Sequence, residues 1–157
     1  MESKVIARNK KAFHDFEIIE KFLAGIQLFG TEIKSLRGGK ASLNDSFCQF
    51  VKRRPLDEFG ELFIKMHINE YSHGTYNNHD PKRERKLLLK GRELKKLERQ
   101  VSAKGMAVVP LCIFLNERGL AKVEIALGKG KKMFDKREDM KDKDNKRELD
   151  RVMKKYN

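Results

Sequence analysis

The sequence lacks tryptophan, has only three prolines and two cysteines in 157 residues, and contains no long hydrophobic run. Its longest apolar stretch, Met106 to Leu115, is about half of the roughly 20 residues that a membrane-spanning helix needs, and Pro110 fits a helix poorly. The N-terminal residues have no apolar core of the kind that a signal peptide requires. These absences predict a cytoplasmic protein with no membrane partner.

The two cysteines, Cys48 and Cys112, are isolated, which argues against a disulfide framework and a cysteine-based metal site. Both lie in apolar segments, where a thiol is a poor nucleophile. His73 and His79 share a loop but lack a third ligand at metal spacing. The glycine-rich stretch from Gly128 lacks the spacing of a phosphate-binding loop. We therefore expect no catalytic residue, no metal, no cofactor, no small-molecule substrate and no enzymatic activity.

Positive charge is what the sequence has in excess. Lys and Arg number 36 against 23 Asp and Glu, which gives a formal net charge of +13 and a pI of about 9.8. Such a charge favours binding to nucleic acid or to an anionic membrane surface. Residues 129–157 alone carry 12 Lys or Arg and 7 Asp or Glu, with too few apolar side chains for a core. We predict an RNA-binding domain over residues 1–128 and a basic tail over residues 129–157 that is disordered until a partner orders it.

Alternating apolar and polar residues indicate several short β-strands. These strands are predicted at residues 16–28, 46–52, 62–68, 107–115 and 122–127. Strands and helices do not alternate regularly, which favours an antiparallel barrel over a doubly wound parallel sheet. The predicted fold class is mainly β, a small closed antiparallel barrel of the oligonucleotide-binding type, with five or six strands and short inserted helices.

Three short helices are expected between the strands. Asn9 is able to cap the first, and Thr31 the second, which would run from Glu32 to Arg37 and end at the two glycines that follow. The third begins at Gly91, because Leu94, Leu97 and Val101 share one helical face, and it stops at Gly105. We expect that apolar face to pack on the barrel.

Residues 82–90 combine five cations with the three consecutive leucines 87–89. We expect the leucines to pack against the core, while the cations face water or a polyanion. Contact with nucleic acid is one interpretation, and a solvated helix face with ion pairs between successive turns is the other.

Lys34, Arg37 and Lys40 form a second basic group around Gly38 and Gly39. Glycines at this point let a phosphate backbone approach closely. Cations at the C-terminal end of a helix, where the dipole favours them, explain the same spacing equally well.

Phe134 is an aromatic residue among cations in the tail. It could stack on an unpaired base, as aromatic residues do in single-stranded RNA sites. It could equally dock the start of the tail on the barrel.

Several sequence motifs in this chain together resemble those of the SsrA-binding protein (SmpB) family of bacteria. They are Asn9-Lys-Lys-Ala, the segment from Ala24 that includes Gly-Thr-Glu-Ile-Lys-Ser-Leu-Arg at 30–37, Asp45-Ser46, Arg85-Lys-Leu-Leu-Leu, Gly128-Lys-Gly-Lys-Lys132 and Asp135-Lys-Arg137. The resemblance covers nearly the whole chain.

The resemblance implies a barrel that binds the tRNA-like domain of transfer-messenger RNA. The complex would reach stalled ribosomes together with elongation factor Tu, for peptide tagging and ribosome rescue by trans-translation. The tail would enter the decoding centre of the small subunit and fold as a helix in the empty message channel.

Motif by motif, the resemblance places Asn9, Glu32, Lys34 and Arg37 on or beside the RNA-binding surface, and Leu88 where it holds that surface in shape. Together with the basic clusters, the candidate RNA-binding residues are Asn9, Lys10, Glu32, Lys34, Arg37, Lys40, Arg83, Arg85, Lys86, Leu88 and Lys90. The candidate ribosome-binding residues of the tail are Lys131, Lys132, Phe134, Asp135, Lys136, Arg137, Asp139, Met140 and Lys141.

Two features depart from the family pattern. Leu23 stands where the family usually has a polar residue that contacts RNA, so that contact is either absent or supplied by a neighbour such as Glu20. The connection at 54–60 is longer than a tight hairpin. An alternative function is a basic ribosomal or ribosome-assembly protein with the same kind of barrel.

Overall fold

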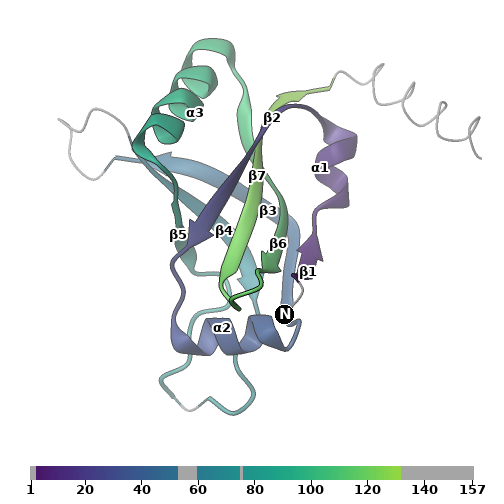
Figure 1. The fold of residues 1–157 in the computed structure, drawn as a ribbon, viewed down its shortest axis with the longest axis vertical. Helices are drawn as coiled ribbons and strands as arrows, with labels where there is room; N and C mark the ends of the chain where they lie inside the picture. Colours follow the sequence, from purple (N-terminus) through teal and green to yellow (C-terminus); the bar gives the residue numbers. More distant parts are fainter. Residues whose placement is uncertain (1–2, 53–59, 75, 132–157) are drawn as a thin grey trace, which may run out of the picture.

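The computed structural model describes residues 3–52, 60–74 and 76–131 (Figure 1). Their elements are, in chain order, β1 (Lys4–Arg8), α1 (Lys10–Asp15), β2 (Phe16–Ile26), α2 (Gly30–Arg37), β3 (Ala41–Val51), β4 (Glu61–Ile68), β5 (Glu84–Leu88), α3 (Gly91–Lys104), β6 (Ala107–Leu115) and β7 (Ala121–Gly130). Within the described ranges, none of the helices has the length and apolar character needed to cross a bilayer.

The strands form one antiparallel sheet in the order β1-β6-β7-β2-β5-β4-β3. The sheet curls until β3, at one edge, packs against β1 and β6 at the other, which makes a nearly closed barrel. The predicted fold class is therefore confirmed.

The predicted strand number is too low, because β1 and β5 were missed. Each has only five residues, and β5 reads Glu-Arg-Lys-Leu-Leu, in which a buried arginine hides the apolar alternation. Of the two interpretations of residues 82–90, the solvated helix face is wrong, because residues 84–88 form strand β5.

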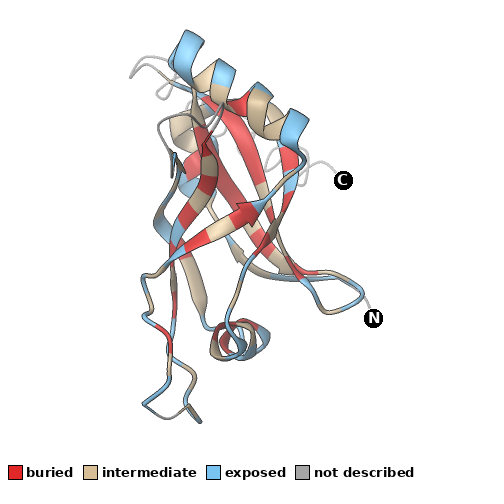
Figure 2. Cartoon of the chain, turned by 90° about the vertical axis from the view of Figure 1, so that its left-hand side faces the viewer, coloured by how far each residue is buried: buried red, intermediate tan, exposed pale blue. Residues whose placement is uncertain are grey.

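The barrel interior is filled by alternate side chains of the strands, with helices at both ends. Figure 2 shows these buried positions along the strands. Leu97 of α3 is buried in this core with Leu94 and Val101 partly buried beside it, as their spacing predicts. Leu36 of α2 enters the same core, and Figure 1 shows α2 and α3 at opposite ends of the barrel. Gly105, with φ of 63°, ends α3 at the predicted place.

Helix α1 lies on the outer face of the sheet rather than at an end. Ala12 packs there on Val109 and Leu111 of β6 and so makes a second, smaller apolar cluster. Asn9 caps the helix as predicted, because its Oδ1 accepts a hydrogen bond from the Ala12 N–H at 3.3 Å. Its Nδ2 donates to the Pro110 carbonyl at 2.9 Å, which fastens the start of α1 to β6.

The last strand continues beyond the predicted domain boundary at residue 128. Lys129 and Gly130 of β7 pair with Glu17 and Phe16 of β2, so the barrel includes two residues assigned to the tail. Gly128 allows a close approach of the two strands, since a Cβ there would lie 3.1 Å from the Cβ of Phe16.

The adjacent leucines Leu87 and Leu88 of β5 test which face of this strand points into the barrel. Leu87 is 1% exposed in the core, whereas Leu88 is 45% exposed on the outside. We expect Leu87→Ala to lower the free energy of unfolding by about 2 to 5 kcal/mol because it leaves a cavity, and Leu88→Ala to cost less than about 1 kcal/mol. Urea denaturation followed by circular dichroism measures both, and equal losses would contradict the register.

Candidate nucleic-acid interface

A buried carboxylate and two arginines join α2 to β5. Glu32 lies in the first turn of α2 and is fully buried. One of its oxygens accepts from Arg83 Nη2 at 2.6 Å, and the other pairs with Nε of Arg85, which is also fully buried. The first oxygen also accepts the Phe29 N–H at 2.7 Å, which caps the helix. One side chain therefore fixes both the start of α2 and its position on the barrel.

The helix cap predicted for Thr31 is wrong. Its hydroxyl instead lies 2.8 Å from Nδ1 of His79, whose Nε2 lies 3.0 Å from the carbonyl of Ile68. Because a carbonyl accepts only, Nε2 donates to Ile68, and in the neutral ring Nδ1 then accepts from Thr31. These contacts tie α2 to the 69–80 loop.

Arg85 has partners for its whole guanidinium group. Besides Glu32, it donates through Nη1 to the carbonyls of Met66 and Arg83, both at 2.9 Å. Its Nη2 lies 3.4 Å from the carbonyl of Asp80 and 3.3 Å from that of Pro81. A buried charge is tolerated only when it is paired and hydrogen-bonded in this way. Arg85 thereby holds α2, β4, β5 and the loop before β5 together.

The pair remains ionised. Burial by itself raises the pKa of the Glu32 carboxyl, but hydrogen bonds from Arg83, the Phe29 N–H and Arg85 outweigh it and hold that pKa below its usual value. Burial lowers the pKa of Arg85, and the Glu32 charge opposes this effect.

This geometry corrects the roles predicted for Glu32 and Arg85. Neither has exposed surface, so they support the candidate RNA surface from beneath rather than form it. In sequence Arg85 looks like the cations around it, and its partner is 53 residues away. The expectation that Leu88 packs against the core is wrong, because its side chain is exposed.

Four of the predicted cations lie together at the α2 end of the barrel. Lys34 and Arg37 are exposed on α2, Lys40 follows its C-terminus, and Arg83 approaches its N-terminus through Glu32. Gly39, with φ of 73°, ends the helix as predicted. Lys34, Arg37 and Lys40 therefore lie near an exposed helix C-terminus, a position compatible both with phosphate contact and with a favourable interaction with the helix dipole. We call these four residues the α2 cations.

Two aromatic rings lie beside the α2 cations. The sequence analysis did not predict these rings as part of the site. Phe29 is 56% exposed, and the guanidinium carbon of Arg83 lies 4.0 Å from its ring centre. The ammonium of Lys34 lies 5.4 Å from the ring centre of Tyr71. Phe29 is exposed and Tyr71 is half-buried, and aromatic rings beside cations are what unpaired bases stack on. No local pattern links these residues, which come from different elements.

An apolar groove of about 360 Å³ lies beside α2, between β2, β5 and β7. Leu88 and Leu120 are exposed along it, with Arg37 and Lys122 at its lining. Gly25 leaves room for Leu88, since a Cβ at Gly25 would lie 3.3 Å from the Leu88 Cβ.

Other predicted RNA-binding residues lie elsewhere. Lys90 is at the start of α3, at the opposite end of the barrel from α2 (Figure 1). Lys86 pairs with Glu61 at 3.4 Å, and Asn9 and Lys10 lie at α1 on the outer face of the sheet. The structure therefore brings together only part of the predicted set.

Of the predicted tail residues, only Lys131 is described. Its N–H donates to the Asp15 carbonyl at 2.9 Å, and its ammonium to the Phe13 carbonyl at 3.3 Å, beside α1. The remaining candidates lie outside the described residues: Lys132, Phe134, Asp135, Lys136, Arg137, Asp139, Met140 and Lys141.

The described residues contain no group of three or more His, Cys, Asp or Glu side chains that could hold a metal ion. Burial raises the thiol pKa of Cys48 and of Cys112, so neither thiol is activated in this structure.

Comparison with known proteins gives consistent matches. Residues 6–155 match the family described as SmpB protein. An SsrA-binding protein of Christiangramia forsetii is 50% identical over 157 residues, which cover 99% of this chain and 96% of that protein. An SsrA-binding protein of Phocaeicola vulgatus is 54% identical over 148 residues, 94% of each chain.

A solved structure described as "tmRNA-SmpB: a journey to the center of the bacterial ribosome" contains a similar chain. It is 48% identical with a TM-score of 0.63, and the match covers 80% of this chain and 84% of that one.

The ion pair beneath α2 can be tested by removing its negative charge. Glu32→Gln leaves the buried Arg85 without a counter-charge, so we expect the free energy of unfolding to fall by about 3 to 5 kcal/mol at neutral pH. Glu20→Gln is the matched control, because Glu20 pairs with Lys96 at 2.8 Å on the exposed surface and its loss should cost less than about 1 kcal/mol. Urea denaturation measures both, and similar losses would contradict this role of Glu32.

Repeating this comparison at lower pH gives a second readout. The folded-state pKa of Glu32 lies below its usual 4.5, so its contribution is complete above about pH 4.5 and disappears as the pH falls through the folded-state pKa. The stability difference between wild type and Glu32→Gln should therefore shrink in acid. A difference that is constant down to complete acid unfolding would show that the carboxylate charge does not matter.

Proposed function

The chain belongs to the SmpB protein family, and on this basis we propose that it binds the tRNA-like domain of transfer-messenger RNA and brings it to stalled ribosomes for trans-translation. The observation that carries the proposal is the surface at the α2 end, where the α2 cations and the rings of Phe29 and Tyr71 accompany a helix that the buried Glu32–Arg85 pair fixes on the barrel. Its role is binding rather than catalysis, in the cytoplasm where ribosomes work.

The α2 cations would contact phosphates, which position an RNA without reading its sequence. Phe29, beside Arg83, offers a face for an unstacked base of an RNA loop. The apolar groove with Leu88 offers a further surface next to the phosphate contacts. The shape of a folded RNA, rather than its sequence, would then decide which RNA binds.

For the tail we propose a separate role on the ribosome. Lys132, Phe134, Asp135, Lys136, Arg137, Asp139, Met140 and Lys141 would probe the decoding centre and the empty message channel. The complex would arrive together with elongation factor Tu, as the family resemblance implies. The barrel supports such a division, because β7 ends at the α3 end and α2 lies at the other (Figure 1).

The RNA-binding role predicts a loss of affinity when the α2 cations are changed. The double variant Lys34→Ala, Arg37→Ala should weaken binding of the tRNA-like domain and reduce the salt slope of log K by about 2, because each phosphate contact releases about one counterion. Lys104→Ala is the matched control, an exposed cation at the end of α3. Salt-titrated filter binding, with an ordinary tRNA as competitor, provides the measurement.

Unchanged affinity in the double variant would remove the α2 surface from the proposal. Equal affinity of the wild type for the tRNA-like domain and for ordinary tRNA, lost steeply with salt, would mean a non-specific polyanion binder and would overturn the proposed function itself.

The tail proposal predicts that binding and tagging separate. Lys132→Ala with Lys136→Ala should leave binding of the tRNA-like domain intact and reduce peptide tagging on ribosomes stalled on a message without a stop codon. Lys131 is left unchanged, because its ammonium contacts the Phe13 carbonyl and supports the end of the barrel. A reconstituted translation reaction measures tagging. Parallel loss of binding and tagging would sink the separate role of the tail.

A further inference from the structure

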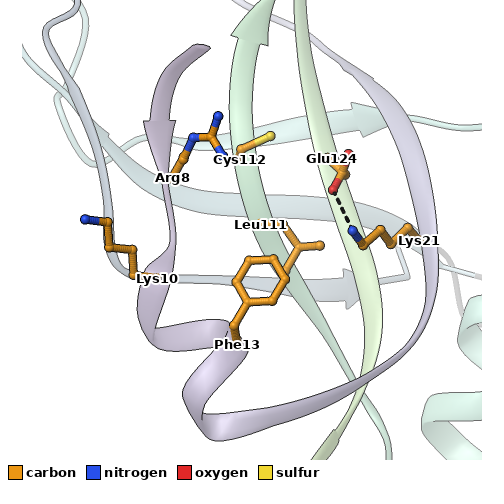
Figure 3. A pocket seen from close by; sticks show the side chains of 7 residues that line it. All are labelled: Arg8, Lys10, Phe13, Lys21, Leu111, Cys112 and Glu124. Atoms are coloured by element: carbon orange, nitrogen blue, oxygen red, sulfur yellow. Dashed lines mark ion pairs between the residues drawn. The ribbon is translucent and has the colours of Figure 1, made fainter. Parts of the chain in front are cut away.

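A second pocket, of about 360 Å³, lies on the outer face of the sheet beside α1 (Figure 3). Phe13 of α1 and Leu111 of β6 both line it, and Figure 3 draws the Phe13 ring in front of the Leu111 side chain. Arg8 and Cys112 line one side of it. Lys10 is the one lining residue among the predicted RNA-binding residues, and the proposed use of the α2 surface does not involve this pocket.

Strand register and the Asn9 cap build the pocket. Arg8 of β1 pairs with Cys112 of β6, and Cys112 pairs with Glu124 of β7, so these three residues form one row across the sheet. Asn9 turns the chain from β1 into α1 and holds it to β6, which brings Phe13 back over the same strands. The ring is 47% exposed and so is available to a ligand.

The electrostatics of the pocket favour an anion. Lys21 pairs with Glu124 at 3.7 Å and lies 5.9 Å from the Phe13 ring centre, so it neutralises the one acidic residue of the lining. Arg8 and Lys10 are exposed and have no ion pair within the described ranges. Two unneutralised cations thus stand beside an aromatic ring and an apolar floor.

We propose that this pocket binds one unstacked nucleotide of the RNA, its base against Phe13 and Leu111 and its phosphate between Arg8 and Lys10. The inference rests on the proposed function and deepens it, by adding a contact that the α2 surface does not make. A base alone would leave the cations unused, and a phosphate alone would leave the ring and the apolar floor uncovered. The pocket volume lies at the lower end of the range for small-ligand sites, which suits one nucleotide.

Cys112 provides a reporter inside the pocket. The full-length protein is alkylated with and without the tRNA-like domain of transfer-messenger RNA, and mass spectrometry separates the Cys112 product from that of Cys48. We expect the bound RNA to slow alkylation of Cys112 severalfold. Uridine monophosphate, at the same nucleotide concentration, should protect weakly or not at all. Equal protection by the mononucleotide would overturn the assignment to RNA.

Phe13→Ala tests the stacking contact. We expect a loss of RNA affinity of about 5- to 100-fold with an unchanged salt slope, because stacking involves no counterion release. Arg8→Ala should instead reduce the slope by about 1. Phe47→Ala is the matched control, since Phe47 is 46% exposed on β3 and lies outside the pocket lining. Phe13→Trp should retain affinity.

The outcomes separate this inference from the proposed function. If Phe13→Ala binds like the wild type, or if Cys112 reacts equally fast in the complex, the pocket assignment is overturned while loss of binding in the α2 variants still supports the proposed function. Loss of RNA selectivity in the wild type overturns the proposed function directly.

Discussion

The buried contact of Glu32 with Arg85 and Arg83 is the interaction on which the rest of the candidate surface depends. It joins the start of α2 to strands β4 and β5, which lie far from α2 in sequence, and to the loop that precedes β5. A single carboxylate serves as helix cap, counter-ion and hydrogen-bond acceptor, so the position of α2 cannot change without leaving a charge unpaired in the barrel. The exposed cations therefore stand on a rigid base.

That base explains how a highly charged protein presents a defined surface. Long lysine and arginine side chains are mobile by themselves and would give only a diffuse positive field. Here α2 fixes the spacing of the cations, and Phe29 and Tyr71 restrict Arg83 and Lys34 by ring contacts. The charge is thus combined with shape, which is what recognition of a folded RNA requires.

The outer face of the sheet beside α1 is also held in place by specific polar contacts. There a helix cap, rather than an ion pair, fastens a short helix across the sheet and places an aromatic ring above an apolar floor. The two surfaces share the barrel as a common scaffold. The end of β7 lies near α1, because Lys131 bonds to the carbonyls of Asp15 and Phe13, and this end of the strand lies away from α2.

Much of this architecture is local in origin, and the sequence by itself determined it: the alternation in Lys122 to Leu127, the apolar face of α3, the Asn9 cap and the glycines that end α2 and α3. These features depend on neighbours in the chain, so a pattern reveals them. Only the tertiary structure decided that Arg85 is buried and Leu88 exposed, because the burial of a charge depends on a partner 53 residues away. It likewise decided which cations share a surface, since their side chains meet only after the sheet has closed.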